Sequence, residues 1–161
     1  MEETVIHPLQ PVFLPSSNVL ILGTMPSPKS RATGFYYGHP QNRFWKVMAA
    51  VLQQPVPTTI AEKKQMLLTH GIALWDVLYS CTICGADDST IHFPKANNIS
   101  ALLAQTSVKR IFTTGKKAFT LYEKIVYPQT QLHAICLPST SPANCRMNLN
   151  ELIKAYRCIT K

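Results

Sequence analysis

The chain has 161 residues, 46% of them apolar, and its 16 cations against 8 anions give a formal net charge of +8. This length and composition fit one globular domain, residues 1–161, and exclude a disordered chain. No apolar run approaches the ~18 residues of a membrane helix, and the acidic, proline-broken start excludes a secretory signal. We therefore expect a cytoplasmic monomer, at the nucleoid in a bacterium or in the nucleus of a eukaryote, with an anionic partner, nucleic acid first.

The first half of the chain predicts two strands and two helices. The apolar run Val19–Leu22 predicts a strand, and Ile72–Trp75 predicts the next one. Between them, apolar side chains recur at helical spacing over residues 42–52. Thr59 and Glu62 form a capping-box pattern, which indicates the start of a second helix that ends near residue 71.

The second half continues the alternation of strands and helices. In order, it predicts a polar loop (81–97), a short helix capped by Asn98, a strand (108–113), a helix that Gly115 opens, a buried strand (132–137) and a last helix capped by Asn148 and Glu151.

This alternation predicts an α/β fold, a three-layer sandwich with a central four-stranded parallel sheet flanked by helices on both faces. In such sheets ligands bind beyond the carboxyl ends of the strands. The loops 23–42, 76–89, 113–115 and 138–144 should therefore meet at one edge of the sheet.

The loop after the first strand combines several kinds of residue that a nucleic-acid site uses. Gly23 allows a close backbone approach, and Lys29, Ser30 and Arg31 can hold phosphates. The run Phe35–Tyr37 offers flat faces, and stacking a base on an aromatic ring is worth about 1–3 kcal/mol. Core packing is the alternative, but three consecutive aromatics cannot all face one core. At least one of them should be exposed or line a pocket.

Asn42 lies at or just before the start of a predicted helix, where backbone N–H groups favour negative charge. A side-chain amide there can orient water or donate to a base that gains charge as it leaves. Plain helix capping is the alternative interpretation.

The loop 138–144 carries small hydroxyl residues between two prolines. A rigid loop of this kind can enter a minor groove, and Arg146 can add a phosphate contact. An ordinary strand-to-helix turn with capping hydroxyls is the alternative.

Two titratable residues near the predicted sheet edge have a functional and a structural interpretation. Asp76 directly follows a strand, the usual place for a working residue, although capping or an ion pair would explain it as well. His39 is a base by residue type or a hydrogen-bonded structural group. The odd count of five cysteines predicts no disulfide framework. The single Cys81–Cys84 pair is a weak metal signal, so we expect no metal.

Four segments carry a resemblance to a known family. They are Gly-Phe-Tyr-Tyr-Gly-His-Pro-Gln-Asn-Arg-Phe-Trp (34–45), Ala-Leu-Trp-Asp-Val-Leu (73–78), Ile-Phe-Thr-Thr-Gly-Lys-Lys-Ala (111–118) and Leu-Pro-Ser-Thr-Ser-Pro-Ala-Asn (137–144). Over about residues 17–160 the chain resembles the uracil-DNA glycosylase superfamily. It is most similar to the hypoxanthine-DNA (deoxyinosine) glycosylase branch and also similar to the mismatch-specific uracil glycosylases.

The resemblance implies a monofunctional enzyme without a cofactor. Such an enzyme flips a deaminated base out of damaged double- or single-stranded DNA and cuts its N-glycosidic bond with water. Hypoxanthine is the first expected substrate, and uracil and xanthine are further candidates. Met25 stands where mismatch uracil glycosylases have asparagine, and Leu137 stands where uracil-specific enzymes have histidine. The departure at Leu137 fits a slower or purine-directed enzyme, and the two departures together slightly favour a non-catalytic module, because both replace polar groups.

The residues and the resemblance together give a set of expected roles. Asn42 is the catalytic amide, and Tyr37 is the stacking residue. The expected base contacts are Gly23, Thr24, Met25, Phe35, Tyr37 and Asp76. The expected DNA contacts are Ser27, Lys29, Ser30, Arg31, Gly115, Lys116, Pro138, Ser139, Thr140, Ser141, Pro142, Asn144 and Arg146. Two rival functions stay open: a mismatch-specific uracil-DNA glycosylase, and a non-catalytic nucleic-acid-binding module.

Overall fold

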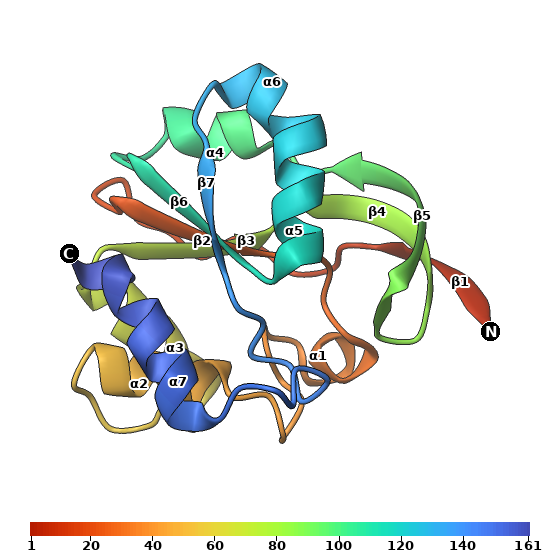
Figure 1. Cartoon of the computed structure of the whole chain (residues 1–161). Helices are drawn as coiled ribbons and strands as arrows, with labels where there is room; N and C mark the ends of the chain where they lie inside the picture. Colours follow the sequence, from red (N-terminus) through yellow and green to blue (C-terminus); the bar gives the residue numbers. More distant parts are fainter.

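A computed structural model describes all residues, 1–161, and its centre is a four-stranded parallel sheet (Figure 1). The strand order is β3-β2-β6-β7, and every neighbouring pair is parallel. The strands are β2 (Val19–Gly23), β3 (Ile72–Asp76), β6 (Arg110–Thr114) and β7 (Ala134–Leu137). The predicted four-stranded parallel sheet is confirmed.

One face of this sheet is covered by three helices. They are α2 (Phe44–Val51), α3 (Ile60–Thr69) and α7 (Leu149–Tyr156), and α7 continues into the 3-10 turn η2 (Arg157–Thr160). Val19 and Ile21 point to this face and pack with Phe44 and Met48, all four in one apolar core. The predicted capping boxes at Thr59–Glu62 and Asn148–Glu151 are present at the starts of α3 and α7.

The opposite face is covered by four short helical segments. They are α4 (Ile99–Ala104), α5 (Lys116–Leu121), the π-helix η1 (Tyr122–Val126) and α6 (Tyr127–Thr130). Leu20 and Leu22 point to this side and share a second core with Ala118 and Tyr122. The alternation of side chains along β2 therefore divides the interior into two cores, as expected for a sheet buried on both faces.

The same side also carries a second, antiparallel sheet in the order β1-β4-β5, which the sequence analysis did not predict. Its strands are β1 (Glu2–Ile6), β4 (Leu78–Cys84) and β5 (Asp87–Ala96). The prediction of a polar loop over residues 81–97 was therefore wrong, because β4 and β5 occupy most of this segment. The segment is a hairpin with inward apolar residues such as Cys81 and Ile83, and it turns at Gly85, whose φ is +56°. The polar side chains on the outward face make this segment look like a loop in the sequence, although apolar residues point inward at alternate positions.

Two smaller expectations also differ from the structure. The loop 23–42 contains a short helix, α1 (Pro28–Thr33), which Ser27 caps and Gly34 ends with a φ of +83°. Cys136 was expected in a buried strand, but it is exposed, because β7 is the edge strand and pairs only with β6. No helix in the molecule is both long enough and apolar enough to cross a membrane.

Candidate active site

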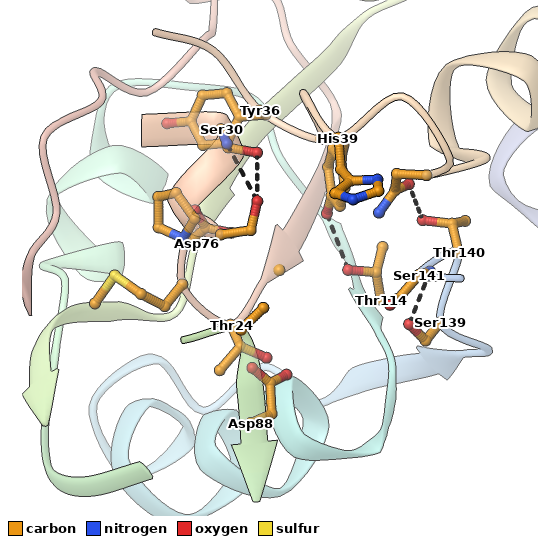
Figure 2. A pocket seen from close by; sticks show the side chains of 17 residues that line it. Thr24, Ser30, Tyr36, His39, Asp76, Asp88, Thr114, Ser139, Thr140 and Ser141 are labelled. Atoms are coloured by element: carbon orange, nitrogen blue, oxygen red, sulfur yellow. Dashed lines mark hydrogen bonds between the residues drawn. The ribbon is translucent and has the colours of Figure 1, made fainter. Parts of the chain in front are cut away.

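A pocket opens at the carboxyl ends of β2, β3 and β6, and we call it the inner pocket (Figure 2). It is closed on one side by the turn between β4 and β5 and on the other by the loop after β7. It brings together eleven of the residues expected from sequence: Gly23, Thr24, Met25, Ser27, Ser30, Tyr37, Asn42, Asp76, Ser139, Thr140 and Ser141. The predicted convergence of loops at this sheet edge is therefore confirmed.

The carbonyl oxygen of Asn42 is held by two donors. Oδ1 accepts from the backbone N–H of Phe44 at 2.9 Å and from the hydroxyl of Thr140 at 2.8 Å. Because a backbone N–H can only donate, these contacts fix which end of the amide is oxygen. The NH2 group has no partner within the protein, so Asn42 is both a structural link at the helix start and a free donor at the pocket.

Tyr37 forms an aromatic wall of the inner pocket. Its ring stacks on Phe44 with centroids 3.9 Å apart and 13° between planes, and its hydroxyl lies 2.9 Å from that of Thr114. Burial raises the pKa of Tyr37 well above its usual value, with Asp76 adding to the effect, so the phenol stays neutral. The backbone of Tyr37 has a φ of +53°, a strained conformation that concentrates at functional sites.

Asp76 is buried at the end of β3, and only one of its two oxygens is paired. Oδ2 contacts Nε2 of His7 at 2.8 Å, and the side chains of both residues are almost fully buried. Oδ1 has no hydrogen-bond partner within the protein. It faces Gly23, where an added Cβ would lie 2.5 Å from it. Glycine at position 23 therefore leaves this acceptor open to the pocket.

Arg43 connects the Asn42 segment to the loop after β7. Its guanidinium donates to the carbonyl oxygens of Met147 at 2.5 Å, Ser141 at 3.1 Å and Asn144 at 2.9 Å, and its backbone N–H donates to Thr140 at 3.1 Å. Together with the Thr140–Asn42 contact, Arg43 thus holds this loop against the start of α2. No role was expected for Arg43, although it directly follows Asn42 in the recognised motif.

His39 stands at the opening of the inner pocket with one ring nitrogen occupied. Nδ1 accepts from the backbone N–H of Gln41 at 3.1 Å. The neutral ring must therefore carry its proton on Nε2, which makes that nitrogen a donor.

A second carboxylate reaches the pocket from an element that the sequence analysis did not predict. Asp88, at the start of β5, is half-buried and faces the hydroxyl of Thr24 in Figure 2. Burial raises the pKa of Asp88. The Thr24 hydroxyl opposes the rise, and the negative charge of Asp76 adds to it.

The expected DNA-contacting residues divide into three groups. Gly115, Lys116, Pro138, Asn144 and Arg146 line a depression beside the inner pocket. Pro142 lines a wider groove outside the pocket, which we call the outer groove, and Asn144 and Arg146 line this groove as well as the depression. Lys29 is exposed and lines neither the depression nor the groove, so it stays an expectation.

Three expectations do not fit the contacts of the residues concerned. Phe35 does not line the inner pocket, because its ring is buried against Trp45 with centroids 5.9 Å apart. Tyr36, its neighbour, lines the pocket instead. Ser30 is 2% exposed and its hydroxyl binds Ser27 and the backbone of Gly38, so it shapes the loop. Arg31 pairs with Glu3 at 3.1 Å, away from the pocket.

Two residues that contact the pocket-lining Asp76 and Tyr37 carried no sequence signal of their own. His7 lies in the N-terminal segment and Thr114 at the end of β6, and only the fold brings them to Asp76 and Tyr37. Leu137 is 3% exposed and packs in the core, so it leaves no polar group in the place where the resemblance expects histidine.

Known proteins resemble this chain in sequence and in fold. Residues 11–158 match the family model of the uracil DNA glycosylase superfamily. A hypoxanthine DNA glycosylase of Methanosarcina acetivorans is 31% identical over 136 residues, covering 84% of this chain and 85% of the relative. One of Methanosarcina barkeri is 30% identical over 138 residues, covering 84% and 86%. The solution NMR structure of a candidate uracil DNA glycosylase from M. acetivorans superimposes with a TM-score of 0.80 at 27% identity, covering 100% of both chains.

Proposed function

The chain belongs to the uracil DNA glycosylase superfamily, and on that premise we propose that it excises hypoxanthine from DNA by hydrolysing the N-glycosidic bond of deoxyinosine. It is a DNA glycosylase of base-excision repair. Its relatives from M. acetivorans and M. barkeri act on hypoxanthine by name, and their similarity spans most of both chains.

The fixed orientation of the Asn42 amide is the observation that carries this proposal. When the N-glycosidic bond breaks, its electron pair moves onto the base, which becomes negative. A preorganised donor aimed at developing charge is worth roughly 2.7–4 kcal/mol of barrier lowering. Because Phe44 and Thr140 occupy the carbonyl oxygen of Asn42, its NH2 group is the part left for the departing base.

The free oxygen of Asp76 supports selection of the deaminated base. Hypoxanthine has an N–H at ring position 1, whereas adenine has a lone pair there. A carboxylate oxygen accepts a hydrogen bond from the first and repels the second. Leaving such a buried acceptor unpaired costs about 1–3 kcal/mol, which disfavours adenine further. The imide N–H groups of uracil and xanthine satisfy the same oxygen, so they are the further substrates that we propose.

Hydrolysis by water, without a covalent enzyme intermediate, suits the pocket. No lysine lines the pocket, so it offers no side-chain amine that could attack the sugar and form a covalent intermediate. The base is flipped into the pocket, which costs a few kcal/mol and least for a mispaired base such as hypoxanthine. Tyr37 offers a face for stacking, and the loop 138–144 is the element that we expect to enter the minor groove.

The surroundings of the pocket support damaged DNA as the partner of one chain. Gly115, Lys116 and Arg146 lie next to the pocket, where they would meet the phosphates. We propose that the enzyme acts as a monomer. Because the substrate is chromosomal DNA, we place the enzyme at the nucleoid or, in a eukaryote, in the nucleus.

The test is incubation of the protein with a duplex that carries one deoxyinosine, followed by alkaline cleavage at abasic sites. We expect a single cleaved product and free hypoxanthine, identified by mass. Matched duplexes that carry uracil opposite guanine, xanthine or undamaged adenine complete the panel. Absence of base release from all three damaged duplexes at excess enzyme would refute the proposal.

The same panel separates the two rivals. A mismatch-specific uracil glycosylase would release uracil opposite guanine faster than hypoxanthine. A non-catalytic binding module would bind DNA in a salt-dependent manner and release no base. The free Asn42 donor and the free Asp76 acceptor favour the enzyme, because a binding module has no need for both at one enclosed pocket.

A further inference from the structure

Seven residues border both the inner pocket and the outer groove, and we call this junction the throat. Most of the seven are serines or alanine. The remaining three are Asn42, His39 and Asp88, and Asp88 is the only carboxylate among them. Asp76, by contrast, lines the inner pocket alone.

The throat is where the reacting bond has to lie if the proposed function holds, and this inference rests on that function. The extruded base occupies the inner pocket, and the sugar-phosphate backbone stays in the outer groove. The bond between the base and C1′ of the sugar therefore passes through the throat. Asn42, His39 and Asp88 all border the throat, and Figure 2 shows Asp88 beside Thr24.

The reaction leaves a second charge to be stabilised at this point. As the base departs with the bonding electrons, C1′ and the ring oxygen of the sugar become positive, and a water molecule must attack C1′. The oxygen of Asn42 is already occupied and its NH2 group can only donate, so Asn42 cannot accept a proton from that water. The loop after β2 presents Met25, whose thioether is a weak acceptor.

We propose that Asp88 is a catalytic residue that faces C1′, stabilises the positive sugar and binds the attacking water. The C1′–N bond breaks, and its electron pair goes to the base. The water oxygen then bonds to C1′, and Asp88 takes one proton of that water. The proton passes on to the departed base, so the products are the neutral base and the sugar hydroxyl of an abasic site.

The β4–β5 hairpin explains how the chain delivers this carboxylate. Asp87 and Asp88 are neighbours at the start of β5, but their environments differ. Asp87 is exposed, and its Oδ1 accepts from the backbone N–H of Ser89 at 3.0 Å and from its hydroxyl at 2.6 Å. Asp88 is half-buried and turned to the throat. The pair therefore supplies a reacting residue and a matched control on one turn.

The experiment compares Asp88→Asn with Asp87→Asn under single-turnover conditions on the deoxyinosine duplex. We expect D88N to lose about 10²-fold or more in the rate of base release, the usual contribution of a general base. D87N should stay within ~2-fold of the wild type, as surface substitutions do. Binding of an uncleavable duplex should be unchanged in both, because Asp88 acts on the reacting atoms.

The dependence on pH gives a readout that a merely structural role would not move. The ionised form of Asp88 is the active one, so the rate should fall as pH drops through a pKa that lies above the usual aspartate value. The charged or titratable groups around Asp88 are Asp76, Asp87, Lys117, Tyr37 and Cys81, and His39 borders the same throat. The acidic limb of the profile should disappear in D88N and persist in D87N.

If D88N does not fold, an Asp88→Ala variant can be tested instead, with added formate to replace the missing carboxylate. Formate should restore a measurable part of the rate in D88A, whereas chloride should not. A D88N enzyme that releases base as fast as D87N, or that loses activity only through weaker DNA binding, would overturn the role of Asp88. If the wild type itself releases no base, the proposed function fails first, and the two failures are thus told apart.

Discussion

Replacement of Asn42 by aspartate separates its two roles without changing its shape. Aspartate keeps an oxygen in the place of Oδ1, so the contacts from Phe44 N–H and Thr140 Oγ1 remain. The NH2 donor, however, becomes a negative oxygen that faces a departing negative base. Loss of one such donor costs roughly 10²–10³-fold in rate, and repulsion between the two negative groups adds to that loss.

Stability should respond in the opposite way to the two obvious substitutions. Asn42→Ala removes the acceptor of two hydrogen bonds, each worth about 1 kcal/mol, and should lower Tm by roughly 2–8 °C. Asn42→Asp should leave Tm nearly unchanged, because both donors keep their acceptor. The assay is thermal unfolding beside single-turnover release of hypoxanthine. An N42D enzyme with wild-type turnover would refute the assignment of Asn42 as the donor to the base.

Three further predictions concern the elements around the pocket. Arg43→Met removes the donor to three loop carbonyls and should destabilise the protein by about 2–4 kcal/mol in urea unfolding, whereas Arg43→Lys should lose less; equal stability of both variants would speak against this link. Gly23→Ala places a Cβ 2.5 Å from Asp76 Oδ1, so it should cost about 1–3 kcal/mol of stability and slow the excision of hypoxanthine; normal rates would contradict this crowding. Hydrogen bonds from Thr59 and Thr58 lower the pKa of Glu62 from 4.5 to about 2, so the stability that it contributes is present above pH 4.5 and lost as pH falls through about 2. The Tm gap between the wild type and Glu62→Gln should accordingly close over that range, and a gap independent of pH would count against the capping box.

Local sequence patterns were enough to predict the elements whose signals lie within the element itself. The strand at Val19–Leu22 is a short buried apolar run, and the capping box at Thr59–Glu62 is a pattern of four residues. The β4–β5 hairpin was missed because its partner strand β1 lies far earlier in the chain, with Ile6 opposite Ser80 and Glu2 opposite Cys84, and because its outward side chains are polar. Pairing at such a distance leaves no local signal.

In the candidate site, too, residues within a local motif were predicted, whereas contacts between distant residues were not. Asn42 and Tyr37 were predicted because a recognised motif contains them. The direction in which the Asn42 amide donates depends on Thr140, 98 residues away, and no local pattern contains that contact. Asp76 was expected at a strand end, but its partner His7 is 69 residues distant. The position of Asp88 at the throat follows from the β4–β5 hairpin, which was not predicted from the sequence.

The contact between His7 and Asp76 affects how this protein should be shortened. The match to the family model begins at residue 11, and His7 lies N-terminal to it. A recombinant fragment trimmed to the shared boundaries would discard the imidazole that contacts Asp76 and leave that carboxylate oxygen buried without its partner. Fragments cut at the family limits are therefore expected to be less active than the whole chain.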